Sequence, residues 1–524
     1  MSTLTSLARA QAQACDIAQP VATVRHVHIA ERPLVFIPLA LAGEANAPLA
    51  ALIGDDPAAP RLLTVSQPRN RDERFAFAAE LARVIVPYLE GFAATTEEVG
   101  GGRGETRPRS LNAPQVVLPN QAGIGFTRLL GRSTRFRRPD GDYPVDPAVP
   151  VLGRWLSFLA ERVEEPGSCL LIAATEVLAR HWASGQSELE DRNLATLLAW
   201  IDPPDGSGGA AAAALGEDPI AFPPTGPATD PGFDNEVLAP LIEACARAEG
   251  DAAARRARAA LEHALRGQLM PTWGLMWRAI ELLRAVPAGA HVARRWDADR
   301  DAFTSYAAYL RDGGAPQPRR DGAVVAARRL SWLERAQARY AAQCAFDDPL
   351  VMAEYRMTGE AFAGDVVAAE PDRVDGTGRR RVLRPRLTLA TADPVQVLPG
   401  MVMTSPSRSG QKAQVISVTP PGGSGGGFRG VVPPAGSDAA AEAADEAGHG
   451  LTLVELELSG GMGRSLVAAL GSVPVTGERV CFTTLTGDYQ PALGFPPTEE
   501  TPWTHGGPPV PYQPTPEDAG EDWS

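Results

Sequence analysis

Eight arginines lie within residues 101–138 of a chain that is acidic as a whole. The segment contains one acid, Glu105, whereas the full chain of 524 residues carries a formal net charge of −14. A guanidinium group can bind a phosphate or a carboxylate through two parallel hydrogen bonds, so clustered arginines favour an anionic partner. We therefore predict that this segment binds a nucleic acid or an acidic partner, with a solvated arginine-rich loop as the alternative. The residues predicted to make this contact are Arg107, Arg109, Arg128, Arg132, Arg135, Arg137 and Arg138.

Three of these arginines have the spacing of one helix face, because they are four and three residues apart. They are Arg128, Arg132 and Arg135. Phe126 and Phe136 are interleaved with them, and aromatic rings are the side chains on which single-stranded bases stack. A second basic run, "GRRRVLRPR" at 378–386, is expected to extend the same surface. The contacts predicted from this run are Arg379, Arg380 and Arg381.

A group of carboxylates in the N-terminal part offers a different chemistry. Glu44, Asp55 and Asp56 lie between expected strands, where they could hold magnesium and activate water in a metal-dependent hydrolase or nuclease. The nuclease pattern also requires an acid and a lysine on the following strand, and "RLLTVSQ" at 61–67 supplies neither. Ordinary turn and cap acids are the alternative interpretation of the three residues.

Other residues that could do chemistry lack the partners that the chemistry needs. His26 and His28 alternate in an expected strand at 21–30, but the sequence identifies no third metal ligand. Lys412, the only lysine, follows Gly410 in "SRSGQKAQV", without the Gly-Lys-Ser/Thr order or the helix of a phosphate-binding loop. We therefore predict no cofactor, no metal site and no catalytic residue, and we expect that the chain is not an enzyme.

Composition limits the class of protein further. Apolar residues make up 44% of the chain and charged residues 21%, which is typical of a soluble globular protein. The five cysteines are far apart and form no CxxC motif, so a reducing, cytoplasmic location is expected. No apolar run is long enough to cross a bilayer, and no membrane association is predicted. The preference for arginine over lysine fits a GC-rich coding bias, and we expect a bacterial protein.

The arrangement of apolar residues predicts an α+β multidomain protein. Residues 20–150 are expected to form an α/β domain that carries the basic loop, with a short helix at 48–54 and an amphipathic helix at 72–92. Residues 151–360 are expected to be helical, apart from a Gly/Pro-rich linker at 202–232. The remaining predicted elements are a small antiparallel β-barrel at 378–490 and a disordered, acidic, proline-rich tail at 491–524.

The barrel region carries a partial likeness to a known family. Short strands such as "GMVMTS", "AQVISV" and "LTLVELELSGG", separated by glycine turns, resemble the small β-barrel of superfamily 1 helicases over residues 382–486. In those helicases the barrel touches the path of the nucleic acid. The motifs of the ATPase are absent from this chain. The resemblance therefore implies a protein that accompanies a helicase rather than one that is a helicase.

These observations favour a non-catalytic accessory or scaffold protein as the function. It would bind nucleic acid, or a nucleic-acid-processing ATPase such as a helicase, through the arginines of 101–138 and 378–386. Two alternatives remain open at this point: a metal-dependent hydrolase or nuclease that uses the N-terminal carboxylates, and a scaffold that binds only proteins.

Overall fold

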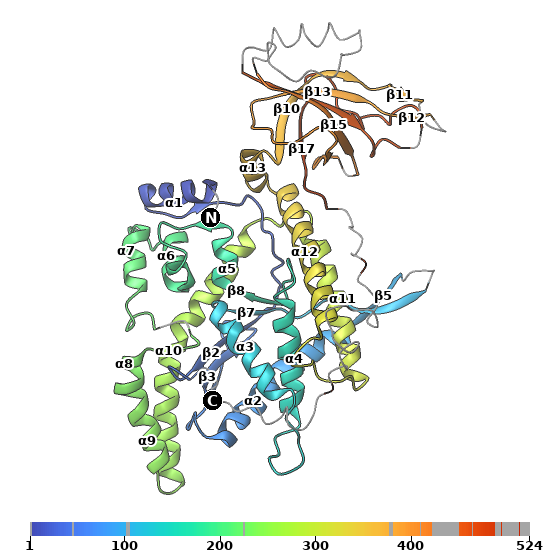
Figure 1. Cartoon of the computed structure of the whole chain (residues 1–524). Coiled ribbons are helices and arrows are strands. Elements are labelled where there is room, and N and C mark those ends of the chain that lie inside the picture. Colours follow the sequence, from blue (N-terminus) through green and yellow to red (C-terminus); the bar gives the residue numbers. More distant parts are fainter. Residues whose placement is uncertain are drawn as a thin grey trace. The chain divides into compact units, whose positions relative to one another are not determined.

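The chain folds into two compact units that meet in sequence between Glu334 and Arg335 (Figure 1). The computed structural model describes residues 3–44, 47–100, 105–223, 226–376, 381–408, 410–421, 450–463 and 465–487, together with residues 494 and 513. We call the described residues up to Glu334 the first unit and those from Arg335 to residue 487 the second unit. The predicted acidic tail, 491–524, lies outside the described residues apart from these two positions.

A five-stranded mixed sheet forms the centre of the first unit. Its strand order is β4-β3-β2-β7-β8, with antiparallel pairing among β2, β3 and β4 and parallel pairing of β2 with β7 and of β7 with β8. The strands are β2 (Leu34–Ala40), β3 (Pro48–Gly54), β4 (Arg61–Thr64), β7 (Val116–Leu118) and β8 (Leu171–Ala173). All residues of β2 are buried, although successive side chains point to opposite faces, so both faces of the sheet are covered.

Long helices cover this sheet. α3 and α4 contact the parallel end of the sheet, whereas α10 contacts β2, β3 and β4. Five long helices of the first unit are α2 (Arg71–Ala94), α3 (Gln121–Thr134), α4 (Ala148–Arg162), α10 (Asp251–Ala285) and α11 (Val292–Arg311), the last of which contacts α2 and β6. The others are α1 (Thr3–Cys15), α5 (Ala174–Ala179), α6 (Leu194–Ile201), α7 (Gly209–Gly216), α8 (Pro231–Phe233), α9 (Ala239–Arg247) and α12 (Ala323–Asp347), which continues past Glu334.

Short ribbons complete the first unit. One pairs β1 (Gln19–Pro20) with β9 (Trp182–Ala183), and the other pairs β5 (Thr96–Gly100) with β6 (Thr106–Ser110). No helix in the described part of the chain has both the length and the apolarity that a membrane span requires.

Several local expectations differ from the structure of the first unit. Residues 48–54 form strand β3 rather than a helix, because pairing between β2 and β4 overrides their local preference. Residues 21–30 are irregular, with a single bridge from Arg25 to Ala288. The alanine-rich part of the expected linker forms α7, in keeping with the high helix propensity of alanine.

The segments 20–150 and 151–360 were expected to be separate, but one hydrophobic core runs from Val27 to Ala307. Strand β8, from the segment that was expected to be helical, belongs to the same sheet as β2. The first two expected regions therefore share one core within the first unit.

A closed antiparallel barrel forms most of the second unit, which confirms the predicted fold class. Its strands follow one another around the barrel in the order β10-β13-β16-β15-β14-β17. Their bounds are β10 (Ala361–Glu370), β13 (Arg386–Thr391), β14 (Val402–Thr404), β15 (Lys412–Thr419), β16 (Thr452–Leu458) and β17 (Arg479–Thr483). Helix α13 (Pro349–Thr358) precedes the barrel, and β11 (Val374–Asp375) pairs with β12 (Val382–Leu383) as a small ribbon.

Strand β16 of the barrel alternates strictly between partly buried and buried residues from Leu453 to Leu458. In β16, Val454, Leu456 and Leu458 point into the core, while Glu455 and Glu457 between them point outward. Lys412 begins β15, so the glycine turn before it leads into a strand and not into the helix that a phosphate-binding loop requires.

An ion pair joins α13 to the barrel and yields a first prediction. Asp393 accepts hydrogen bonds from Arg356 at 2.7 and 2.8 Å and from the Ala363 N–H at 2.7 Å. Burial acts to raise the pKa of Asp393, but these donors outweigh it and hold the pKa below its usual range. We expect Arg356→Ala to lower the free energy of unfolding of the second unit by about 1–2 kcal/mol at neutral pH. Hydrogen exchange of the Ala363 amide in the full chain measures this change.

The destabilisation caused by Arg356→Ala should depend on pH. A carboxylate with a lowered folded pKa contributes stability above its unfolded pKa, and the contribution is lost as the pH falls through the folded pKa. The cost of Arg356→Ala should therefore shrink in acid. Asp365→Ala is the control, because Asp365 pairs with Arg479 while both side chains are more than half exposed. An equal cost for the two variants would contradict the prediction.

Candidate anion-binding pocket

Two neighbouring helices, α3 and α4, build the pocket that we identify as the candidate site. Asn120 caps the N-terminus of α3, and its side-chain oxygen accepts a hydrogen bond from the Gly123 N–H at 3.1 Å. Its buried face includes Ile124 and Leu130 and packs on the core of the first unit. The arginines at 128, 132 and 135 therefore lie away from that core face, as their spacing predicts.

Two glycines let α3 and α4 approach closely. A Cβ added to Gly131 would lie 2.8 Å from the Ser157 nitrogen, and one added to Gly153 would lie 2.7 Å from the Arg135 Cα. Real side chains do not tolerate such distances, so larger residues would force the helices apart. The close approach brings the arginine row of α3 against a polar row on α4.

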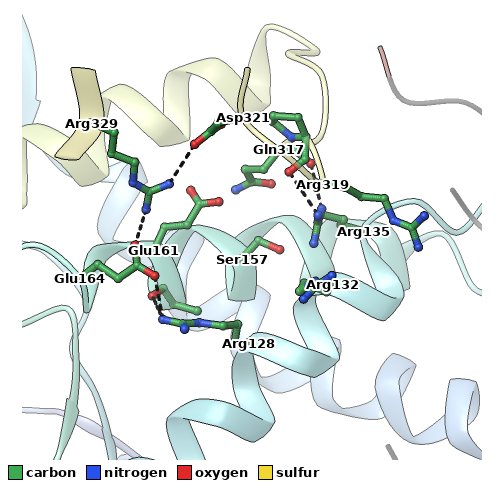
Figure 2. Close-up of a pocket in the computed structure, with 12 residues that line it drawn as sticks. Arg128, Arg132, Arg135, Ser157, Glu161, Glu164, Gln317, Arg319, Asp321 and Arg329 are labelled. Atoms are coloured by element: carbon green, nitrogen blue, oxygen red, sulfur yellow. Dashed lines mark hydrogen bonds and ion pairs between the residues drawn. The ribbon is translucent and has the colours of Figure 1, made fainter. Parts of the chain in front are cut away.

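The polar rows face a cavity of about 290 Å³. Figure 2 shows arginines on both sides of it: Arg132 and Arg135 from α3 and its end, and Arg329 from α12. The cavity is lined by Arg128, Arg132, Arg135, Ser157, Ala160, Glu161, Glu164, Gln317, Pro318, Arg319, Asp321 and Arg329. Five guanidinium groups thus meet three carboxylates at one cavity, an excess of two positive charges.

Part of this charge is paired within the pocket. Glu164 forms ion pairs with Arg128 at 3.1 Å and with Arg329 at 2.7 Å, and Arg329 lies 3.7 Å from Asp321. Arg135, which is 4% exposed, donates to the Gln317 carbonyl at 2.9 Å. These contacts hold the arginines in place before any ligand arrives.

Two lining side chains of α4 have unusual surroundings. The Ser157 Oγ is buried and makes no hydrogen bond within the part of the chain that the structure describes. Glu161 is one helical turn further on, and Figure 2 marks no hydrogen bond or ion pair to its carboxylate. Although this side chain is exposed in the open cavity, the surrounding protein atoms raise the pKa of Glu161, against the opposing effect of Arg329 and Arg135.

The other arginines of the basic segment lie elsewhere. Arg107 pairs with Asp301 of α11 at 2.7 Å, which attaches the β5–β6 ribbon to that helix, whereas Arg109 pairs with Glu97 on the opposite strand of the same ribbon at 2.7 Å. Arg137 donates to the Ser133 carbonyl and lies over the Phe75 ring. Arg138 is exposed. The sequence-predicted surface therefore splits, and only its α3 part reaches the pocket.

The predicted stacking aromatics and the second basic run do not join the pocket. Phe126 and Phe136 are 6% and 8% exposed, so neither ring is free to stack on a base. Their burial fits the general tendency of phenylalanine to lie in the core. Arg379 and Arg380 lie outside the described residues, and Arg381 is exposed in the second unit.

The three carboxylates of the hydrolase alternative have separate partners. Glu44 pairs with Arg69 at 2.7 Å and Asp55 pairs with Arg32 at 2.6 Å, while Asp56 accepts from the Ala58 N–H at 2.9 Å. Because Glu44 and Asp55 flank the two ends of β3, a strand of seven residues, roughly 20 Å separates them. Among the described residues, no group of three or more histidine, cysteine or acidic side chains is arranged to hold a metal.

The rings of His28 and His181 are packed against neighbouring side chains and backbone. His28 stacks on Trp296 with ring centroids 4.0 Å apart, and burial lowers the pKa of His28 to about 4. His181 accepts from the His26 N–H at 3.2 Å, and burial likewise lowers the pKa of His181 to about 4. Both rings are therefore neutral at physiological pH.

The sequence analysis did not predict the pocket residues that lie outside the basic segment 101–138, which come from α4 and from residues 317–329. Ser157, Glu161 and Glu164 recur at spacings of four and three, the same spacing as the arginine row. This equal spacing of the two polar rows was the feature of the sequence that could have indicated that they face each other. Arg319, Asp321 and Arg329 carry no comparable pattern.

Protein-family models, curated proteins and solved structures give no match to this chain. The likeness of residues 382–486 to a helicase barrel thus rests on the residues alone.

Proposed function

We propose that this protein is a non-catalytic accessory protein that binds the phosphate backbone of a nucleic acid at the arginine pocket. The observation that supports this proposal is the convergence of five guanidinium groups, from α3, α12 and the segment between α11 and α12, on one cavity. Phosphate is the group that such clusters of guanidinium forks bind most strongly, since each oxygen accepts from more than one donor.

The length of the arginine row matches the spacing of successive phosphates along a nucleic-acid strand. From Arg128 to Arg135 the helix advances seven residues, which corresponds to about 10 Å. A duplex presents one phosphate per about 3.4 Å of each strand, so this row spans two or three phosphates. A repeating polyanion therefore uses the row more fully than a single small anion would.

The lining also bears on specificity. The residues that line the cavity include no aromatic ring, and the nearby Phe126 and Phe136 are buried. Without a stacking surface, contacts to the backbone dominate, and such contacts carry no sequence information. We therefore expect binding that is independent of base sequence.

Features of the sequence support a protein partner and a cellular location. The likeness of residues 382–486 to a helicase barrel supports an ATPase that acts on nucleic acid, such as a helicase, as the protein partner. The five cysteines are all unbridged, which fits the cytoplasm.

Binding of an oligothymidylate at increasing salt tests the proposal. We expect the logarithm of the binding constant to fall linearly with the logarithm of the salt concentration. The double variant Arg128→Ala/Arg132→Ala should weaken binding and reduce the slope by about 1.4, since each lost phosphate contact on a single strand contributes about 0.7. Fluorescence anisotropy of the labelled oligonucleotide measures both quantities.

The control removes the same charge elsewhere. Arg61 and Arg83 are exposed and paired with Glu80, as Arg128 is with Glu164, so Arg61→Ala/Arg83→Ala matches the test variant in charge and exposure. It should bind as the unmodified protein does. If the unmodified protein fails to bind at low salt but retains an acidic protein partner through Arg132, the nucleic-acid proposal is wrong and the pocket serves protein recognition.

A further inference from the structure

The carboxylate of Glu161 lies in the pocket where an incoming anion would bind. Figure 2 shows it projecting into the cavity from α4, with Ser157 between it and Arg135. Within the described residues its oxygens have neither a hydrogen bond nor an ion pair, whereas the neighbouring Glu164 is paired twice. Glu161 is therefore a negative charge that the pocket surrounds with cations but does not fix to any of them.

A second polar group nearby also has no partner. The Ser157 hydroxyl is 6% exposed by residue, lines the same cavity and makes no hydrogen bond in the described part of the chain. Buried polar atoms are normally paired, because a buried group that loses its hydrogen bonds to water and gains none in the protein destabilises the fold. An anion in the cavity would supply the missing acceptor to Ser157.

An anion that binds here meets like charge at Glu161. Two negative groups in one recess cannot both remain ionised without a cost, so protonation of Glu161 makes binding more favourable. The same argument holds in reverse by linkage, because a bound anion raises the proton affinity of Glu161.

We propose that anion binding at the arginine pocket is coupled to the uptake of one proton by Glu161. This inference rests on the proposed function, because it names the residue that sets the affinity of the same site. Glu161 sets the affinity of the pocket for the anion. Its ionised carboxylate repels the anion, and protonation of Glu161 removes this repulsion.

The other charged groups around Glu161 do not offer an equivalent proton. The ionisable groups that face it are arginines from three elements, the acids Glu164 and Asp321, and the phenol of Tyr306 on α11. Arginines stay charged in this range, and burial raises the pKa of Tyr306 further from neutrality. Glu164 and Asp321 already have cationic partners. No histidine lines the cavity.

Because the free protein already has a raised Glu161 pKa and an anion raises it further, binding takes up a proton between these two pKa values. Affinity should therefore rise as the pH falls through the interval between these two pKa values, by at most about tenfold per pH unit. It should become constant below the pKa of Glu161 in the free protein.

Oligothymidylate anisotropy across this pH range, in the full chain, tests the coupling. Thymine bases and phosphodiesters do not take up protons between about pH 5 and about pH 8, so the probe adds no titration of its own. We expect the unmodified protein to bind about three- to tenfold more tightly at the acid end. Glu161→Gln should bind with the tight affinity at every pH. The matched variant Glu164→Gln removes a negative charge but leaves Glu161 to titrate, so its affinity should keep the pH slope.

The outcomes separate the two proposals. Binding without a pH slope, or an unchanged slope in Glu161→Gln, would overturn the coupling and leave the proposed function intact. If no oligonucleotide binds at any pH, sulfate is the second probe, read as thermal stabilisation relative to Arg132→Ala. Sulfate stabilisation that grows in acid and loses its pH dependence in Glu161→Gln supports the coupling while the nucleic-acid function fails. Absence of both effects overturns both proposals.

Discussion

Replacing Asp299 with alanine should lower the free energy of unfolding of the first unit by about 3–5 kcal/mol. Asp299, on α11, is 1% exposed, and its carboxylate accepts from the Cys169 N–H at 2.6 Å and from the Ser168 hydroxyl at 2.7 Å. It also pairs with Arg162 at 3.0 Å. The alanine variant leaves a buried N–H without an acceptor and removes the buried partner of a mostly buried guanidinium. Breaking such a network costs far more than its net contribution to stability.

A control on the same helix isolates burial as the cause. Asp301, two residues further on, pairs with Arg107 through side chains that are 40% and 47% exposed. Asp301→Ala should therefore cost less than about 1 kcal/mol. Urea unfolding of the two full-length variants, followed by tryptophan fluorescence, compares them. Equal costs would show that the Asp299 network does not stabilise the fold.

Gly153→Ala is expected to be the second most damaging change, with a cost of about 2–4 kcal/mol and a loss of affinity at the pocket. The new methyl carbon would lie 2.7 Å from the Arg135 Cα and 2.5 Å from the Thr134 Oγ1, so α3 and α4 must separate. That movement displaces Arg135 from the carbonyl of Gln317 and widens the cavity. Thermal unfolding and oligothymidylate binding measure the two effects.

A glycine-to-alanine substitution in the neighbouring helix α3 should raise the free energy of unfolding instead of lowering it. Gly125 lies within α3, and a methyl group added there would meet nothing within 4 Å. Gly125→Ala should therefore stabilise the chain by about 0.5–1 kcal/mol, because alanine loses less backbone entropy in a helix. If both variants destabilise equally, the close contact at Gly153 is not what limits the helix approach.

Periodicity was enough to predict the elements that repeat, and not enough for those that depend on distant pairing. The row of Arg128, Arg132 and Arg135 on α3 and the alternation of β16 are both visible in the sequence, since each is set by neighbours a few residues away. Strand β3 was missed because "PLAALIG" becomes a strand only through its partners β2 and β4.

The candidate site shows the same limit. Charge density predicted one arginine surface, but Arg107 and Arg109 meet acids that lie about 190 residues further on or on the paired strand. Glu161 faces the arginine row only because Gly131 and Gly153 let two helices touch. Such contacts between distant segments leave no signature in a single sequence.

The β5–β6 ribbon depends on charge for its position. Arg109 and Arg300 share Glu97 and also meet Asp297, while Arg107 reaches Asp301, so the ribbon is clasped to α11 by alternating cations and anions. Ions in solution weaken contacts of this kind, whereas the apolar sheet is indifferent to them. High salt should therefore release the ribbon from α11 first. A protease that cuts after arginine would then cleave at Arg109, which precedes Ser110, well before the rest of the unit unfolds, whereas Arg107 precedes Pro108 and resists such cleavage.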